Sequence, residues 1–469
     1  MPPHLSLATA LTPSNTAPNV LDLIGNTPLV KVSHLDTGPC ELFLKLESQN
    51  PAGSIKDRIA LSMIEAAERD GSLKPGGTLV EATAGNTCLG LALVASQKGY
   101  KLTLVIPDKM SQEKIFHLRA LGAHVVITRS DVGKGHPEYY QDMAERIARE
   151  TGGFYVNQFA NPNNPKTHEA STGPEILAQM NGQIDAMVVG VGSGGTLTGL
   201  GRYFKKHSPK TEMVLADPKG SILAPLVNDG ITIEAGSWLV EGIGEDFVPD
   251  NCDLKFVSHA YTITDAESIA TAREVLQKEG IICGSSSGTL IAAALRYCRA
   301  QTSAKRVVTL VCDSGNKYLS KIYNDYWLDD HGFATHAVEN NLRDLITRPY
   351  QKGSAITIAP GDTLADAYRK MKMYDVSQLP VMVKEHINGI INETDILLAI
   401  TGNPDGFSIK VAQAMSRDLI TVDVNTPPQD LLGTFQQGMV AIVKDGDAFL
   451  GLITPIDLLN YLRKRVGHA

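Results

Sequence analysis

The sequence predicts an α/β protein with two open, mainly parallel sheets around a cleft, followed by a smaller module built from a repeat. Near-continuous apolar runs occur at residues 102–107, 124–128, 186–192, 213–217 and 306–312. Runs of this kind are typical of parallel strands that are buried on both faces. Amphipathic stretches separate them, and strand alternating with helix predicts an open α/β sheet. Because the segment from Thr27 to Tyr326 is too long for one small sheet, we expect two lobes.

The sequence changes in character after Trp327. Residues 327–344 are polar and predict a linker or a connecting helix. Two later segments share one order of elements: a strand, a helix, a pair of strands, and a second helix that begins near an aspartate. This order predicts a paired, pseudo-symmetric module. The expected divisions are an N-terminal extension (1–20), a large first domain (21–326), the linker (327–344) and two repeats (345–402 and 408–469).

Composition excludes several classes of protein. The 469 residues carry a net charge of -8 without a Lys/Arg-rich run, which disfavours a nucleic-acid binder. No apolar stretch reaches the roughly 18 residues that span a bilayer, and no Lys or Arg precedes Lys31, so we expect a cytoplasmic protein without a membrane anchor. The six cysteines are scattered, which predicts neither a disulfide framework nor a metal site.

The segment GSIKDR (53–58) precedes an amphipathic helix and offers a candidate for covalent chemistry. A lysine in the first turn of a helix lies near the positive end of the helix dipole, which disfavours its ammonium form. A desolvated lysine with a lowered pKa can form a Schiff base. The alternative is a solvated Lys56 beside a capping Asp57.

Two further turns from a strand into a helix are rich in hydroxyl groups: TAGNT (83–87) and CGSSSG (283–288). Free N–H groups at a helix start bind anions such as a substrate carboxylate, and a serine hydroxyl can bond a ligand heteroatom. In both turns, a plain helix cap is the alternative.

The segment GVGSGGT (190–196) satisfies G-x-G-x-x-G after an apolar run. Asp217 lies 22 residues beyond Gly195, which is the arrangement of a dinucleotide fold. A phosphate cradle that uses the Ser193 and Thr196 hydroxyls explains the same residues, so the motif leaves both interpretations open. The segment EGIGEDF (241–247) predicts a mobile acidic loop.

Taken together, these motifs resemble the β-family, or fold type II, of pyridoxal-phosphate enzymes, and most of all its cystathionine β-synthase branch. The resemblance spans residues 21–326. Within this range, four further segments carry the resemblance: LDLIGNTPLV (21–30), ESQNPAGSIKDR (47–58), NQFANPNNPKTH (157–168) and DSGNKYLS (313–320). The repeats after residue 340 resemble a tandem pair of CBS domains, or Bateman module. The resemblance implies a fold-type II catalytic domain with pyridoxal 5'-phosphate as its cofactor.

Residue by residue, Lys56 matches the lysine that binds the cofactor as a Schiff base, and Asn86 matches the residue that bonds its ring hydroxyl. Ser286 matches the hydroxyl that faces the pyridine nitrogen. The phosphate-binding positions match Gly192, Ser193, Gly194, Gly195 and Thr196, which favours a phosphate monoester over a dinucleotide. The substrate-binding positions match Thr83, Gly85, Thr87, Gln158 and Gly242.

The resemblance implies a β-replacement that condenses L-serine, or an activated serine, with L-homocysteine to give cystathionine, with release of hydrogen sulfide from cysteine as a further activity. Lys56 is expected to take and return the Cα proton. One alternative is cysteine synthase, the O-acetylserine sulfhydrylase of the same fold. Another is a nucleotide sensor with a degenerate catalytic scaffold. Relatives also imply a homodimer or higher homo-oligomer.

Departures from the family pattern affect three sites. Ala84 and Cys88 alter the substrate loop, and Glu245 stands where animal synthases have Tyr. His4 has no Cys beside it before Leu21, so no haem is expected. In the second repeat, Thr454 and Asp457 match a nucleotide-ribose site for an adenosyl ligand, whereas the first repeat has Asn392 before Asp395. A dimerisation surface is the alternative role of the pair.

Overall fold

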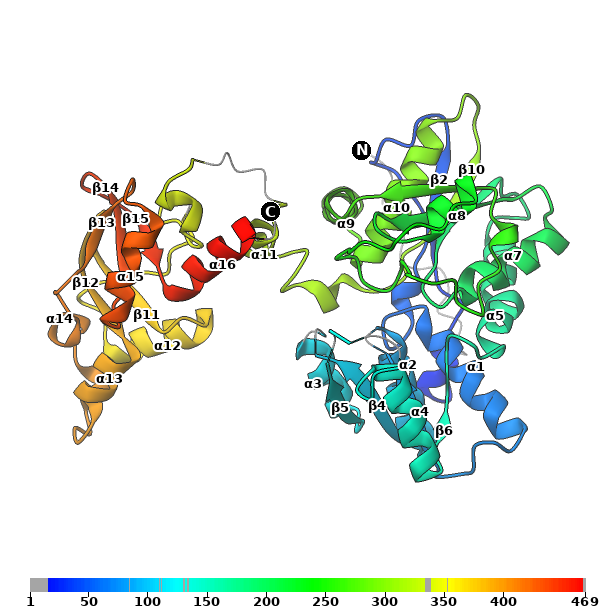
Figure 1. Ribbon diagram of the computed structural model, residues 1–469, viewed down its shortest axis with the longest axis horizontal. Helices are drawn as coiled ribbons and strands as arrows, with labels where there is room; N and C mark the ends of the chain where they lie inside the picture. Colours follow the sequence, from blue (N-terminus) through cyan, green and yellow to red (C-terminus); the bar gives the residue numbers. More distant parts are fainter. Residues whose placement is uncertain are drawn as a thin grey trace. The chain divides into compact units, whose positions relative to one another are not determined.

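A computed structural model describes residues 16–83, 85–108, 110, 112–129, 131–132, 135–333, 339–351 and 353–466. His4 and Ala84 lie outside these residues. The chain divides into two compact units between Tyr323 and Asn324, and each is described by itself (Figure 1). Within the described part, no helix is long and apolar enough to cross a membrane.

The first unit contains a six-stranded sheet with the order β1-β2-β10-β7-β8-β9. Its strands are β1 (Leu29–Lys31), β2 (Glu41–Lys45), β7 (Ala186–Gly190), β8 (Glu212–Pro218), β9 (His259–Ile263) and β10 (Arg306–Leu310). Its helices are α5 (Asn163–Thr167), α6 (Gly173–Gln179), α7 (Gly195–His207), α8 (Leu223–Asp229), α9 (Asp265–Glu279) and α10 (Ser285–Arg299). All neighbours run parallel except β1 and β2, which pair antiparallel at one edge.

A four-stranded sheet, β5-β4-β3-β6, forms the second lobe of this unit (Figure 1). Its strands are β3 (Thr78–Ala82), β4 (Lys101–Pro107), β5 (His124–Thr128) and β6 (Phe154–Tyr155). The helices α1 (Lys56–Arg69), α2 (Thr87–Lys98), α3 (Gln112–Ala120) and α4 (Tyr140–Thr151) belong to it. All of its strands are parallel. The predicted pair of mainly parallel α/β lobes is therefore confirmed.

A buried ionic network fixes the start of α1. Arg58 donates to the two carboxylate oxygens of Glu47 at 2.7 and 2.8 Å and to both oxygens of Glu175 at 2.7 Å. Lys45 donates to Glu175 at 2.8 Å and to the Thr27 carbonyl at 2.7 Å. The Arg58 and Glu47 side chains are only 2% and 0% exposed. Two cations thus balance two anions, which offsets the cost of removing these charges from water.

The second unit contains two repeats of similar order. The first consists of α12 (Leu364–Tyr374), β11 (Gln378–Val383), β12 (His386–Asn392) and α13 (Glu393–Ile400). The second consists of β13 (Thr421–Asp423), η8 (Pro428–Leu431), α15 (Leu432–Gln436), β14 (Ala441–Asp445), β15 (Ala448–Ile453) and α16 (Pro455–Val466). The short helices α11 (Asp325–Asp330) and η6 (Leu342–Leu345) precede both repeats in the chain, and α14 (Val411–Ala414) lies between them.

Two details of this unit differ from the expected pattern. The helix expected after Thr426 is reduced to a 3₁₀ turn and one short α-turn, because Pro427 and Pro428 lack the N–H group of a helix interior and Gly433 disfavours helix. Leu342, expected in the linker, and Leu345, expected at the start of the first repeat, are instead buried in the core of the second repeat. The chain therefore enters that core before it forms the first repeat.

We predict that Arg58→Met destabilises the protein by about 3–5 kcal/mol, because it leaves two buried carboxylates without their main cation. Chemical unfolding followed by circular dichroism measures this change. The matched control is Arg129→Met. Arg129 also makes a two-point contact, with Asp131 at 2.9 and 2.8 Å, but both side chains are largely exposed. Equal losses in the two variants would contradict the structural role of the Arg58 network.

Candidate active site

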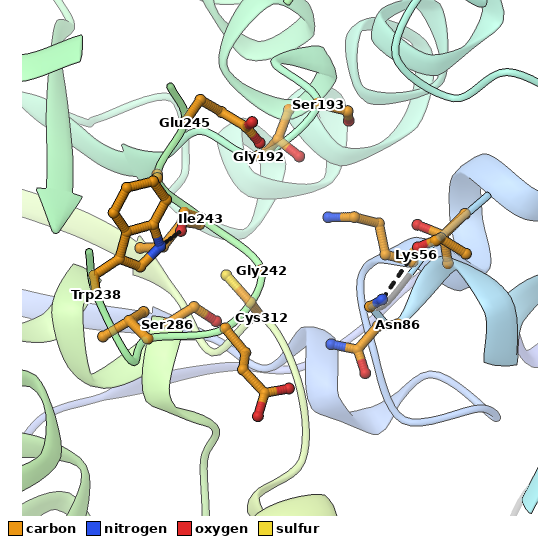
Figure 2. Close-up of a pocket in the computed structure, with 18 of the residues that line it drawn as sticks. Lys56, Asn86, Gly192, Ser193, Trp238, Gly242, Ile243, Glu245, Ser286 and Cys312 are labelled. Atoms are coloured by element: carbon orange, nitrogen blue, oxygen red, sulfur yellow. Dashed lines mark hydrogen bonds between the residues drawn. The ribbon is translucent and has the colours of Figure 1, made fainter. Parts of the chain in front are cut away.

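A cavity of about 620 Å³ lies where the carboxyl ends of strands from both sheets meet. Twelve residues singled out from the sequence line it: Lys56, Thr83, Gly85, Asn86, Thr87, Gln158, Gly192, Ser193, Gly194, Thr196, Gly242 and Ser286. Gly195 does not line it, although it is adjacent to residues that do. Figure 2 shows the Lys56 side chain pointing into the cavity, with Ser193 and Ser286 on other walls. The structure thus brings together motifs that are far apart in the chain.

Lys56 is the first residue of α1 and has no competing ion pair among the described residues. Its backbone is held in place because the preceding Ile55 N–H donates to the Cys312 carbonyl at 2.9 Å and Ser54 forms a bridge with Asp313. Burial lowers the pKa of the Lys56 amine below its usual value. The environment therefore favours the neutral amine, which is the form that acts as a nucleophile or base.

The glycine-rich loop after β7 leads into a helix start with features that suit an anion. A Cβ atom at Gly192 would lie 2.6 Å from the Gly242 carbonyl oxygen, and one at Gly194, where φ is +80°, would lie 2.5 Å from Cys252 Cβ. Only glycine fits these two positions. No side chain caps α7, so the N–H groups of its first turn remain available to an anion. Ser193 accepts from Asn164 at 2.9 Å, which orients its hydroxyl.

The TAGNT turn and Gln158 form a second polar wall. Thr87 donates to the Gln158 side-chain oxygen at 2.6 Å, and the Gly85 N–H donates to the Thr83 hydroxyl at 3.1 Å. Behind them, the carboxyl of Glu81 accepts the Gln158 backbone N–H at 3.1 Å. Glu81 is 1% exposed, and this burial raises its pKa to about 8. The carboxyl of Glu81 is therefore mainly neutral at pH 7.

The three serines at the start of α10 have different partners. Ser285 accepts the Glu241 backbone N–H at 3.0 Å, and Ser287 accepts the Cys312 N–H at 2.9 Å. Among the described residues, no partner is found for the hydroxyl of Ser286, which lines the cavity. Ser286 is therefore the serine of this turn that remains available to a ligand.

The loop at residues 241–247, which the sequence predicts to be mobile, makes several contacts with other segments. The Glu241 carboxylate accepts from Lys114 at 2.5 Å and from Lys321 at 2.6 Å. Gly244 N–H donates to the Val191 carbonyl at 2.8 Å. Two lysines from different segments therefore neutralise the charge of Glu241 and connect the loop to the rest of the first unit.

Glu245 in the same loop lines the cavity next to Gly192 (Figure 2). Burial, and then the nearby Asp246 and Asp217, raises the pKa of Glu245 to about 9. At neutral pH this side chain is therefore a hydrogen-bond donor rather than an anion. An anionic ligand and a neutral Glu245 can occupy the same cavity without strong repulsion.

Sequence analysis assigned no role to several polar residues of the site. Asp313, Lys317 and Tyr318 follow β10, and Asn86 contacts both Asp313 and Lys317. The signal that could have found them is their position at the carboxyl end of a buried parallel strand, where ligands of α/β sheets bind. Cys312, to which the sequence analysis also assigned no role, lines the cavity, and burial raises the pKa of its thiol to about 12.

Residues 20–313 match a family model described as "Pyridoxal-phosphate dependent enzyme", and residues 342–402 and 411–464 match the CBS domain. The chain is 36% identical over 461 residues to a cystathionine beta-synthase of Dictyostelium discoideum, covering 95% of this chain and 92% of the relative. This chain belongs to the cystathionine β-synthase family. A cystathionine beta-synthase of Apis mellifera is 34% identical over 465 residues, covering 95% and 91% of the two chains.

A solved structure extends this likeness to three dimensions. A hydrogen sulfide-producing enzyme from Fusobacterium nucleatum is 37% identical, with a TM-score of 0.61, and the match covers 65% of this chain and 100% of that one. Like the other members of the family, this enzyme is therefore a pyridoxal-phosphate-dependent lyase with a C-terminal pair of CBS domains.

The residues of the cavity fit pyridoxal phosphate. The uncapped start of α7, with two positions that only glycine fits, suits the phosphate group. The neutral form of Lys56, favoured by burial, suits a carbonyl group. The unpartnered hydroxyl of Ser286 and the amide of Asn86 offer hydrogen bonds to the ring. The cavity thus presents a suitable group for each end of the cofactor.

We predict that Glu81→Gln changes how stability depends on pH. In the folded protein Glu81 keeps its proton up to about pH 8, whereas the unfolded chain loses it near its ordinary value of 4.5. The folded state binds more protons in this range, so the contribution of Glu81 to stability falls as pH rises. Relative to wild type, the variant should therefore gain stability between pH 5 and pH 8, by about 4 kcal/mol at most.

Thermal unfolding at several pH values tests this expectation. Glu150→Gln, at an exposed position on α4, is the control and should follow wild type throughout. A constant difference between Glu81→Gln and wild type across the range would show that Glu81 is ionised in the folded protein.

Proposed function

We propose that this enzyme condenses L-serine, or an activated serine, with L-homocysteine to give cystathionine, and that it also releases hydrogen sulfide from cysteine. The observation that carries the proposal is the gathering of Lys56, the TAGNT turn, the glycine loop and Ser286 around one cavity, in a chain that aligns along nearly its full length with cystathionine β-synthases. The hydrogen sulfide-producing enzyme of Fusobacterium nucleatum supports the second activity.

In this proposal each wall of the cavity holds one part of the reactants. Lys56 would hold the cofactor, Asn86 its ring hydroxyl and Ser286 its ring nitrogen. The loop of Gly192, Ser193, Gly194, Gly195 and Thr196 would hold its phosphate. The substrate carboxylate would lie against Thr83, Gly85, Thr87 and Gln158, with Gly242 on the opposite side.

When bound, pyridoxal phosphate stabilises negative charge at the substrate Cα. Lys56 would remove the Cα proton, because burial lowers the pKa of its amine and so favours the basic, neutral form, and it would return the proton after the thiol has replaced the β-substituent. Ser286 is neutral and cannot hold the ring nitrogen protonated as an aspartate would. This limits the lifetime of negative charge at Cα and so favours departure of the β-substituent.

The two alternative functions are not favoured. Cysteine synthases share the lysine and the two loops, but the curated relatives along nearly the whole chain are cystathionine beta-synthases. A bare nucleotide sensor would not need Lys56, Asn86 and Ser286 gathered in one cavity. We also propose a homodimer or larger homo-oligomer in the cytoplasm, in keeping with six cysteines that are all free.

The second repeat carries the proposed adenosyl-nucleotide site. Thr454 donates through its N–H and its hydroxyl to one Asp457 oxygen at 2.7 and 2.5 Å, and Thr347 donates to the other oxygen. In the first repeat, Asn392 and Asp395 form a similar pair through a capping box. Thr454 and Asp457 are therefore already ordered at the start of α16, and a ribose would have to share or replace these bonds.

We predict that Lys56→Ala folds but has no turnover and no visible absorption band of lysine-bound cofactor, because no other group supplies both the Schiff base and the proton transfer. Lys206→Ala, at an exposed site on α7, is the control. Absorption spectra and a product assay provide the measurements. The assay offers serine or O-acetylserine with homocysteine or sulfide. Cysteine formed only from O-acetylserine and sulfide would instead establish a cysteine synthase.

We predict that Asp457→Ala weakens binding of an adenosyl ligand at the second repeat at least tenfold, because the ribose loses its carboxylate partner. Calorimetric titration of S-adenosylmethionine, AMP and ATP measures the affinity, and Asp395→Ala in the first repeat is the matched control. Tight binding unaffected by Asp457→Ala would refute the assignment. Absence of binding to wild type would indicate a structural role for the pair.

A further inference from the structure

Asn86 is held by two charged residues from a distant segment of the chain. Lys317 donates to the Asn86 side-chain oxygen at 2.9 Å, and the Asn86 amide nitrogen donates to Asp313 Oδ2 at 2.7 Å. Lys317 also donates to the carbonyl oxygen of Gly53 at 3.1 Å. One ammonium group thus joins Asn86 to the loop that carries Lys56.

These contacts determine which way the Asn86 amide faces. An ammonium group can only donate and a carboxylate can only accept, so the reversed amide would place NH₂ against Lys317 and a carbonyl oxygen against Asp313. In the observed orientation, the oxygen and one N–H of Asn86 are used by Lys317 and Asp313. Among the described residues, no hydrogen bond of good geometry uses the second N–H, although the Tyr318 hydroxyl lies near the amide. Asn86 also lines the cavity.

Burial of Asp313 strengthens the preference of the Asn86 amide for this orientation. Asp313 is 0% exposed, and its Oδ2 also accepts the Tyr318 hydroxyl at 2.7 Å. Its Oδ1 has no partner among the described residues. A buried carboxylate with few partners needs a nearby cation. Lys317 is a cation near Asp313, since both residues contact the side-chain amide of Asn86. Loss of Lys317 would therefore affect both the amide and the charge behind it.

We propose that Lys317 and Asp313 are positioning residues: they orient Asn86 so that its second N–H, rather than its oxygen, is presented to the ring oxygen of pyridoxal phosphate. This inference rests on the proposed role of Asn86 in the cofactor site, and it does not depend on which substrates the enzyme uses. Without Lys317 the amide can reverse, and its oxygen would then face an oxygen of the cofactor. The contact would change from attractive to repulsive.

A double-mutant cycle on the holoenzyme tests the proposal. The four proteins are wild type, Lys317→Met, Asn86→Ala and the double variant. Two quantities are measured without substrate: the ratio of the cofactor absorption bands that report the protonation of the ring oxygen, and the dissociation constant of the cofactor from reconstitution of the apoenzyme. Lys317→Met should shift the band ratio and weaken cofactor binding about five- to twentyfold.

The decisive comparison is made in the Asn86→Ala background. There, Lys317→Met should have a clearly smaller effect on both quantities, because the amide through which Lys317 acts is missing and only its charge near Asp313 remains. Equal effects of Lys317→Met in both backgrounds would overturn the proposal, as would a wild-type ratio in Lys317→Met. A wild-type ratio in Asn86→Ala would overturn the role of Asn86 as well, while the product assay would still test the reaction independently.

Two further variants separate positioning from a general loss of structure. Lys317→Arg keeps a cationic donor and should restore part of the band ratio. Lys98→Met removes a lysine that pairs with Glu65 and Glu68 and does not line the cavity, and it should leave the ratio unchanged. If Lys317→Met proves unfolded by circular dichroism, Lys317→Arg and Lys317→Gln carry the test. A shift in Lys98→Met equal to that in Lys317→Met would contradict the proposal.

Discussion

The two-point contact between Arg58 and Glu47 holds the segment on which the catalytic centre depends. Arg58 lies two residues after Lys56, so the start of α1 cannot move without disturbing a buried pair at 2.7 and 2.8 Å. Glu175 on α6 and Lys45 on β2 complete the network. Buried ion pairs contribute little net stability on average, but removal of one partner is costly. The network therefore makes the position of Lys56 hard to change.

The cavity is surrounded by the starts of four helices that lack side-chain caps. They are α1, α2, α7 and α10. By contrast, α9 has Thr264 as an N-cap, and α12 and α13 have capping boxes. Uncapped N–H groups and the positive ends of the helix dipoles favour anions. Such a cavity suits a cofactor phosphate and a substrate carboxylate together, and it disfavours a protonated Lys56.

Charge around the cavity is compensated by groups that come from different parts of the first unit. Lys114 of α3 and Lys321 share the carboxylate of Glu241, while Lys317 and Asp313 share Asn86. In the described part of the chain, neither Glu81 nor Glu245 forms an ion pair, and burial raises the pKa of each. The site thus combines ionised pairs that fix geometry with neutral carboxyl groups that do not repel an anionic ligand.

The parallel strands, the glycine loop, the TAGNT turn and the repeat were all predictable from the sequence, because each is a local pattern of burial, turn residues or spacing. Lys56 and Ser286 could be singled out for the same reason, since each lies in a short motif at a helix start. The ion pairs of the 241–247 loop and the short helix of the second repeat were not foreseen. In the first case the partners are lysines from distant segments, and in the second two prolines and a glycine outweigh the repeat pattern.

Only the tertiary structure decided the hydrogen-bond partners and the orientation of the Asn86 side chain. Its partner Asp313 is 227 residues away in the chain, and Lys317 is 231 residues away. A hydrogen bond between such distant side chains leaves no period or spacing in a sequence. The same holds for Glu81, which occupies an ordinary strand position and is neutral only because folding places it behind Gln158 without a cation. The sequence by itself determined which chemical groups are available, and folding decided their orientation and charge, because both depend on neighbours that meet only when the two sheets enclose the cavity.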